Sequence, residues 1–176
     1  MRLAELLDRC LALEERTAAL YRKFAAARAE DRELVELWTT LAADEDEHAR
    51  SIRNAQRDLG PEEGELSTVE GCQAALADVA GRLRDADALD ANATPSRHLA
   101  AALDIELSEI EALRRLGLRA SRQQRVPDQD HAHLRRLADT ARRRSQDGHV
   151  RLAAALLLAR ERLATATGPS ASRRTL

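Results

Sequence analysis

The sequence contains very few aromatic residues: one Trp, one Tyr and one Phe, which together make up 2% of the chain. Glycine and proline are also scarce, at 7 and 4 of the 176 residues. Sandwiches and barrels are rich in β-forming residues and turns, so this composition argues against an all-β fold. Apolar residues still make up 44% of the chain and recur at regular intervals, which excludes a disordered chain. Much of that fraction is Ala and Leu, the strongest helix formers, so we predict an all-α protein.

Neither sign of charge dominates, because 28 basic and 30 acidic residues give a net charge of −2. This balance provides no long-range attraction to nucleic acid or to an anionic membrane. No apolar run approaches the ~18 residues of a membrane span, and the chain opens on an amphipathic pattern rather than a signal peptide. Cys10 and Cys72 fall on apolar stripes, which is typical of reduced thiols. We therefore expect a cytoplasmic protein with neither nucleic acid nor membrane as a partner.

Proline is poorly tolerated inside helices but fits their first turn, so the chain is divided at Pro61, Pro95, Pro127 and Pro169. Between these points, apolar residues recur every three or four positions. This spacing predicts long helices over about 2–28, 31–58, from 95 onward and over 130–166, and a crossover helix near 69–83. We therefore expect a four-helix bundle over 1–167, with a helical crossover between the second and third long helices, and a disordered tail over 168–176.

Ionisable residues interrupt the apolar seams of the predicted helices. Burying such a side chain is costly unless it is paired or binds a metal. Glu14 lies in the stripe of the first helix, and Glu106 lies in that of the third. Glu45 and His48 lie in the seam of the second helix and share a face, because they are three residues apart. Gln146 and His149 share a face of the predicted fourth helix.

An acidic residue three positions before a histidine is weak evidence on its own. Asp128 with His131 and Asp130 with His133 have the same spacing, but they lie in a polar link, where we expect them to be solvated. The whole set is more specific, because a carboxylate on each of two helices and Glu-x-x-His on the other two bind two irons in helical bundles. About four carboxylates neutralise two divalent irons, and imidazoles complete the shells while leaving a position for dioxygen or peroxide.

At these residues the chain resembles the rubrerythrin branch of the ferritin-like superfamily, over about residues 3–57 and 97–160. Glu14 and Tyr21 match within LEERTAALYRKFA, and Glu45 and His48 match within LAADEDEHARSI. The segment ALDIELSEI matches the third helix, with Glu106 and a second acid at Glu109. The resemblance implies a ferritin-like four-helix bundle that holds two irons per chain and forms homodimers or larger homo-oligomers.

The resemblance also implies roles for the site residues. Glu45 and Glu106 would bridge the irons, with Glu14 and Glu109 as terminal ligands and His48 and His149 as nitrogen ligands. Tyr21 would bond a site carboxylate and take part in catalysis. The implied activity is a peroxidase or ferroxidase in peroxide detoxification or iron handling, which acts on ferrous iron with peroxide or dioxygen. It would need an external electron donor, because no Cys-x-x-Cys pairs of a rubredoxin module follow the bundle.

One departure from the family pattern supports an alternative. Gln146 stands where a carboxylate is expected, and a hydrogen-bonding role is favoured for it over direct ligation. Glu109 could restore the negative charge that Gln146 lacks. Arg142, one turn before Gln146, could pair with a carboxylate in place of a metal. The alternative is a ferritin-like bundle with a degenerate metal site that serves as a binding or scaffold protein. A third interpretation is a single zinc or manganese ion held by some of these ligands.

Overall fold

The computed structural model describes residues 3–58, 69–115 and 132–166, and every regular element within these ranges is a helix. The all-α prediction is confirmed for this part of the chain. The helices are α1 (Leu3–Ala26), α2 (Arg32–Asp58), α3 (Val69–Asp87), α4 (Pro95–Arg115), α5 (Ala132–Arg144) and α6 (Gly148–Ala166). The predicted link over 118–130 falls largely, and the tail over 168–176 entirely, outside the described residues.

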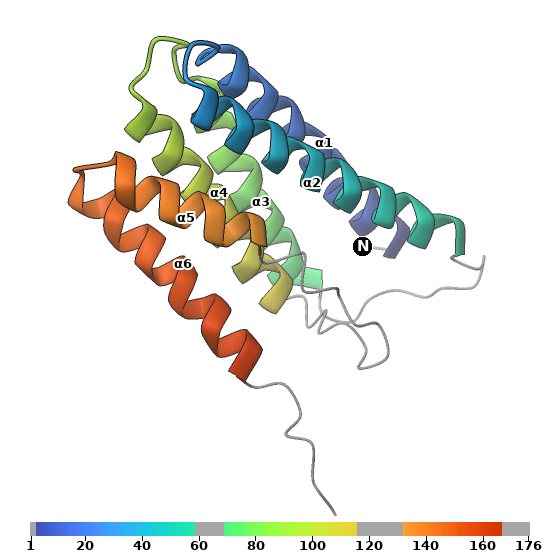
Figure 1. Ribbon diagram of the computed structural model, residues 1–176. Coiled ribbons are helices and arrows are strands. Elements are labelled where there is room, and N and C mark those ends of the chain that lie inside the picture. The colour runs from blue at the N-terminus through green and yellow to red at the C-terminus, as the bar shows by residue number, and fades with distance from the viewer. Residues whose placement is uncertain (1–2, 59–68, 116–131, 167–176) are drawn as a thin grey trace, which may run out of the picture.

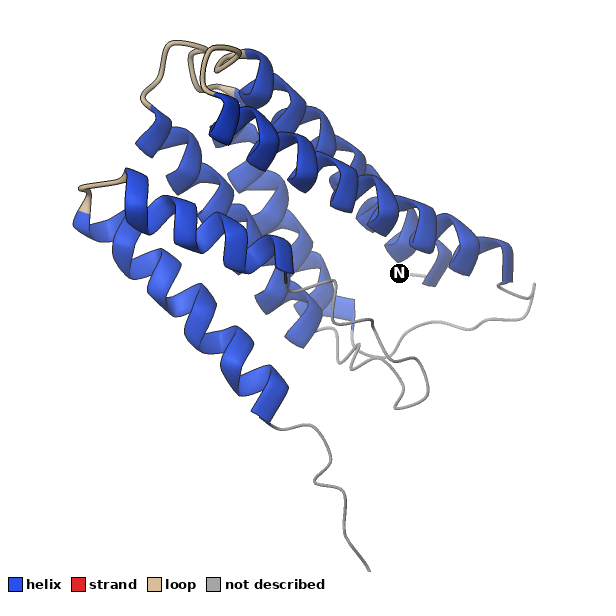
Figure 2. Cartoon of the chain, in the orientation of Figure 1, coloured by secondary structure: helices blue, strands red, loops and turns tan. Residues whose placement is uncertain are grey.

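In the described ranges the helices form three hairpins, α1 with α2, α3 with α4, and α5 with α6 (Figure 1). Their short connections, at 27–31, 88–94 and 145–147, lie at the same end of the molecule (Figure 2). Helix α1 also packs against α3, α2 against α5, and α4 against both α5 and α6. Helices α1, α2, α5 and α4 therefore surround a common interior, with α3 closing the side between α1 and α4.

Two predicted helix starts are confirmed by their capping bonds. Asp31 precedes α2, and its carboxylate accepts a hydrogen bond from the Leu34 amide at 3.3 Å. Thr94 precedes α4, and its hydroxyl accepts a bond from the Arg97 amide at 3.4 Å. Pro95 is the first residue of α4, where its missing amide hydrogen costs nothing.

The interior is filled mainly by Leu and Ala, and the three aromatic residues meet at its centre. Tyr21 and Phe24 of α1 and Trp38 of α2 are each 0% exposed. The predicted seam of α2 is correct in its first half, because Leu34, Trp38, Leu41 and Glu45 are all buried. This packing fixes α1 and α2 face to face, and Glu45 lies at the end of the same buried stripe.

The prediction of one continuous helix over 130–166 is wrong. Helix α5 ends at Arg144, and the chain folds back through 145–147 into α6. Ser145 Oγ accepts a hydrogen bond from the Asp147 amide at 3.1 Å, and Asp147 Oδ1 accepts one from the His149 amide at 2.8 Å. These short side-chain bonds replace helical backbone bonds, and Asp147 becomes the N-cap of α6.

The turn also changes which residues face the core. Val150, Ala154 and Leu157 are the buried residues of α6, while Leu152 and Leu156 are 59% and 50% exposed. A continuous helix over 130–166 would place Leu152, Ala155 and Leu156 on its apolar side, but the break resets the phase and all three are exposed. Arg144, at the end of α5, bonds Asp31 at 3.1 Å and Glu33 at 3.0 Å, and so ties α5 to the start of α2. No helix within the described ranges is long and apolar enough to cross a membrane.

Candidate metal centre

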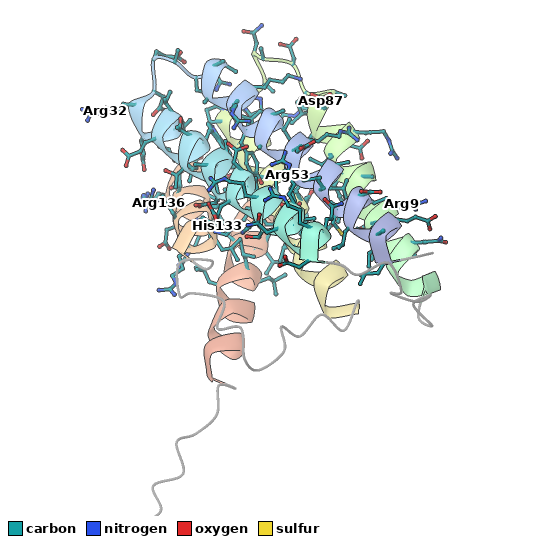
Figure 3. All side chains as sticks on the ribbon, turned by 90° about the vertical axis from the view of Figure 1, so that its right-hand side faces the viewer. Arg9, Arg32, Arg53, Asp87, His133 and Arg136 are labelled. Atoms are coloured by element: carbon teal, nitrogen blue, oxygen red, sulfur yellow. The ribbon has the colours of Figure 1, made fainter. Side chains whose placement is uncertain are left out.

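Five side chains from four helices meet inside the bundle. Glu14 comes from α1, Glu45 and His48 from α2, Glu106 from α4, and His133 from α5. Figure 3 shows His133 on the short helix α5, beside α2. No single hairpin could assemble this set, so the three-hairpin arrangement is what creates the cluster.

The donor atoms form two overlapping triplets. Glu14, Glu45 and His48 make the first, and Glu45, Glu106 and His133 make the second. Within each triplet, one atom from each residue lies within 4.8 Å of the others. Glu45 belongs to both and is 0% exposed, so its carboxylate stands between two potential ion positions.

The first triplet faces the surface. His48 Nδ1 lies 3.0 Å from Glu45 Oε2 and 3.5 Å from Glu14 Oε2. The side chains of His48 and Glu14 are 34% and 20% exposed, in contrast to Glu45. Glu45 and His48 share a face because they are three residues apart on α2. This side of the cluster is therefore the one that solvent and small solutes reach.

The second triplet is closed. His133 Nε2 lies 3.8 Å from Glu106 Oε2, and their side chains are 5% and 4% exposed. The rings of His48 and His133 lie edge to face, with their centroids 6.0 Å apart and their planes inclined by 65°. On the other side of the ring, His133 Nδ1 lies 3.7 Å from Asp44 Oδ2. Asp44 is therefore placed to orient the imidazole from outside the cluster.

Two further polar contacts hold the acids of α4. The buried Tyr21 hydroxyl donates a hydrogen bond to Glu106 Oε1 at 2.8 Å. The Thr17 hydroxyl lies 3.5 Å from Glu109 Oε1, and it also bonds the Leu13 carbonyl at 3.0 Å. Glu109 is half-buried beside the cluster, but it belongs to neither triplet.

The cluster is electrostatically crowded with acids. Burial raises the pKa of Glu45 well above its usual value, and the charge of Glu106 adds to this shift. Burial also raises the pKa of Glu109, together with the charges of Glu45 and Glu106. Burial opposes ionisation of Glu14 as well, but its bonds to His48 and Glu45 outweigh that effect and lower its pKa. Hydrogen bonds to Glu14 and Glu45 raise the pKa of His48 to about 11. Without a cation, protons must therefore carry the compensating charge.

Unsatisfied polar atoms in the cluster also indicate that it fits a divalent cation. Three buried polar atoms of the cluster lack a hydrogen bond of ordinary length and angle: Glu14 Oε2, Glu45 Oε1 and His133 Nδ1. An unpartnered buried polar atom is costly, and most are satisfied in folded proteins. A cation would satisfy the two carboxylate oxygens directly, while binding through Nε2 would leave His133 Nδ1 facing Asp44.

Two residues that were predicted to belong to the site lie elsewhere, and this corrects the sequence-based site. Gln146 lies in the α5–α6 turn, His149 lies in the first turn of α6, and both are exposed. The neighbouring Ser145 contacts Ser96, at the start of α4. Glu106 follows ten residues later, about 15 Å along that helix. Because the turn at 145–147 ends α5, Gln146 and His149 cannot extend its buried face toward the cluster.

His133 of α5 is the histidine that the structure brings to the cluster in place of His149, contrary to the sequence-based prediction. The spacing from Asp130 was noticed, but the polar surroundings predicted a solvated residue, whereas His133 is 5% exposed. Asp130 itself lies outside the described residues. The signal that could have found His133 is its position four residues before Leu137, on the apolar side of α5.

Arg142 does not approach the acids as the scaffold alternative required. It is exposed near the end of α5, nine residues after His133 and about 13 Å further along the helix. Two arginines on α1 and α2, which carry Glu14 and Glu45, also pair with exposed acids rather than with the cluster. Arg22 pairs with Asp46, and Arg53 pairs with Glu15.

Comparisons with known proteins assign no role to this centre. No protein-family model, curated protein or solved structure matches the chain. The geometry of the residues therefore carries the functional argument alone.

Proposed function

We propose that the protein is a non-haem di-iron oxidoreductase of the peroxidase or ferroxidase type. The observation that carries this proposal is the pair of carboxylate–histidine triplets that share the buried Glu45. Oxygen and imidazole donors of this kind suit iron, and a carboxylate-rich set from four helices is the pattern of di-iron bundles. The same pattern supports a ferritin-like assignment, with α1, α2, α4 and α5 as the four ligand helices and α3 as the crossover.

The chain's own residues would divide the work of holding two ions. Glu14 and His48 serve the partly exposed position, and Glu106 and His133 serve the closed one. Glu45 contributes to both, and Glu109 adds a fourth carboxylate nearby. Four carboxylates would balance the four positive charges of two ferrous ions, so the acids would no longer need protons.

Bound ferrous ions would supply one electron each for the two-electron reduction of peroxide or dioxygen. The protein must admit a small oxidant and exclude larger ones. The partial exposure of His48 and Glu14 gives one open side, while Glu45, Glu106 and Tyr21 close the interior. An external donor, or incoming ferrous iron itself, would restore the electrons.

Metal analysis tests the proposal directly. The purified protein is loaded anaerobically with ferrous iron, desalted and assayed for iron, then mixed with peroxide or air. We expect about two irons per chain, as in di-iron carboxylate bundles, and their oxidation on mixing. Glu45→Ala/His48→Ala should lose most of the iron, because it removes the shared carboxylate and one imidazole.

A matched pair of histidine variants separates the structural site from the sequence-based one. His133→Ala should lower the iron content, whereas His149→Ala should leave it unchanged because His149 is exposed on α6. One tightly held metal per chain would instead support the mononuclear zinc or manganese interpretation. If neither the parent protein nor any variant retains specific metal, the oxidoreductase proposal is wrong and the search should turn to a protein partner.

A further inference from the structure

A groove of about 250 Å³ lies between α3 and α4, on the side of the hairpin that faces solvent. The two helices pack side by side along it (Figure 1). Its lining combines four apolar and four charged side chains: Ala86, Leu89, Ala100, Ala101, Arg82, Asp85, Arg97 and Asp104. All four charged side chains are exposed, and Ala100 and Ala101 are only half-buried. Within the described ranges, the groove is therefore an apolar strip that no other helix covers.

The α4 wall of the groove has a self-complementary order of residues. Arg97, Ala100, Ala101 and Asp104 are spaced by three, one and three positions, so they share one face of the helix. Read along the helix, this face presents a positive charge, two small residues and a negative charge. An antiparallel copy of the same helix presents the reverse order, which places Arg97 opposite Asp104 and Ala100 opposite Ala101. A two-fold axis repeats each of these pairings.

The two charges at the ends of this face are available for such pairing. Arg97 is exposed and has no ion-pair partner within the described part of the chain. Asp104 Oδ2 lies 3.7 Å from Arg82 Nη1, and the side chain of Asp104 is 52% exposed. This long contact leaves the Asp104 carboxylate able to accept a second guanidinium. The chain thus holds one exposed cation and one exposed anion at matching distances from the Ala100–Ala101 centre.

The centre of the face permits close approach. Alanine has no side-chain atom beyond Cβ, so two helices that meet at Ala100 and Ala101 can pack near the ~8 Å lower limit of helix spacing. Ala86 and Leu89 extend the apolar floor toward α3. An apolar centre with charges at its margin is the usual arrangement of a protein–protein interface.

The size of the face also fits a second copy. Helices α3 and α4 contain 19 and 21 residues and are therefore about 28 and 31 Å long. Two adjacent helices, each about 10 Å wide, offer roughly 600 Å² per copy, against about 800 Å² in standard interfaces. This area suits a dimer that dissociates on dilution.

We propose that the α3–α4 face binds a second copy of this chain, with a two-fold axis between Ala100 and Ala101 and with Arg97 of each copy paired to Asp104 of the other. The family resemblance implies association of copies but names no face. The proposal does not depend on metal binding, because no residue of this face belongs to the candidate metal centre.

Charge exchange tests the pairing. The metal-free protein is studied by sedimentation velocity between about 1 and 100 µM, a range that reveals weak dimers. We expect the parent protein to dimerise as its concentration rises. Arg97→Asp or Asp104→Arg alone should weaken dimerisation by about 100-fold or more, because each places like charges opposite one another at both contacts. The double variant Arg97→Asp/Asp104→Arg should return to within about 10-fold of the parent protein, with Arg82 beside the new arginine opposing full recovery.

Two controls complete the test. Arg84→Asp makes the same charge change at an exposed position on α3 that does not line the groove, and it should leave dimerisation unchanged. Leu156→Glu tests the other candidate face, on α6, where Leu152 and Leu156 are exposed. It should also have no effect. Melting temperatures of all variants show whether each is folded, and if one single variant does not fold, the other single variant and the parent protein still decide.

Three results would overturn the inference. The first is a parent protein that stays monomeric throughout the concentration range. The second is a dimer that Leu156→Glu dissociates while the charge reversals do not, which would place the interface on α6. The third is a double variant as weak as the single ones, because the two charges would then not face each other. The iron content of the protein decides the proposed function separately, whichever of these results is obtained.

Discussion

The contact between Asp44 and His133 shows how a single residue outside the cluster can control it. Asp44 is adjacent to Glu45 on α2, yet its carboxylate lies beside His133 Nδ1, at 3.7 Å. A ligand histidine commonly directs its other ring nitrogen at a carboxylate, which fixes the ring and strengthens the ligand. Asp44 is 39% exposed, so it can be changed without opening a cavity in the core.

We expect Asp44→Asn to weaken metal binding at the centre by about 10- to 100-fold, the usual effect of removing such a partner. The number of ions bound at saturation should not change, because every proposed ligand is retained. Equilibrium titration with ferrous iron, or with manganese as a redox-stable substitute, measures both quantities. Asp46→Asn is the control, because it makes the same change two residues later, where Asp46 pairs with Arg22. If the two variants bind equally well, Asp44 has no part in orienting His133.

At the scale of elements, the turn at 145–147 determines how α5 and α6 are arranged. Its stabilising bonds come from Ser145 and Asp147, and the side chain of Gln146 takes no part in the bonds described above.

We expect Asp147→Ala to lower the free energy of unfolding by about 1 kcal/mol, the typical contribution of an N-cap. Gln146→Ala, at an exposed position in the same turn, should change it by less than about 0.5 kcal/mol. Urea denaturation of metal-free protein compares the two, and similar losses would mean that the cap does not hold the turn.

The sequence predicts some elements much better than others, for physical reasons. Helices α1 and α2 have regular apolar seams and a short connection, so their pairing and the inward direction of Glu45 follow from local pattern. No proline marks the break after Arg144 in the sequence. It depends on hydrogen bonds from Ser145 and Asp147, whose side chains are equally common on helix surfaces. A pattern that continues through such a break assigns the wrong face, as happened for Leu152 and Leu156.

The residues of the candidate site likewise divide into those that the local pattern predicts and one that only tertiary packing places. Glu14, Glu45, His48 and Glu106 are brought together as predicted, because each interrupts an apolar seam. His133 could not be ranked in the same way, because it is the second residue of α5 and follows a polar stretch. Its burial comes from the packing of α5 against α2, which is a tertiary contact. The sequence pattern therefore favoured His149 and placed His133 in solvent, and only the fold shows that His133 is the histidine that joins the cluster.

At the scale of the whole molecule, cation binding should stabilise the bundle by removing repulsion among its buried acids. Anything that binds the folded state alone stabilises it, by about 2.7 kcal/mol at 100 times the dissociation constant. We therefore expect chelation to lower the melting temperature of the loaded protein. Glu45→Gln should show little difference between its loaded and chelated forms. If chelation does not change the melting temperature of the loaded parent protein, a metal centre built from these residues is excluded.

This stabilisation should also increase with pH. His48 has a pKa of about 11 in the metal-free protein, so at neutral pH it carries a proton that a metal ion must displace. Burial likewise raises the pKa of Glu45, which favours its protonated form. Raising the pH lowers the cost of removing these protons, so the apparent affinity rises. The difference in melting temperature between loaded and chelated protein should therefore be larger at pH 8 than at pH 6.

The anchoring of α5 at Arg144 gives the molecule a mechanical property. The helix is 13 residues long, held at one end by the ion pairs with Asp31 and Glu33, and it carries His133 at the other end. About 16 Å of rigid rod separates the anchor from the imidazole, so a tilt of about 4° would move the ring by about 1 Å. Misplacement by about 1 Å can cost about 100-fold in an enzymatic rate. The ion pairs of Arg144 with Asp31 and Glu33 therefore help to position the His133 ring, although they do not contact it.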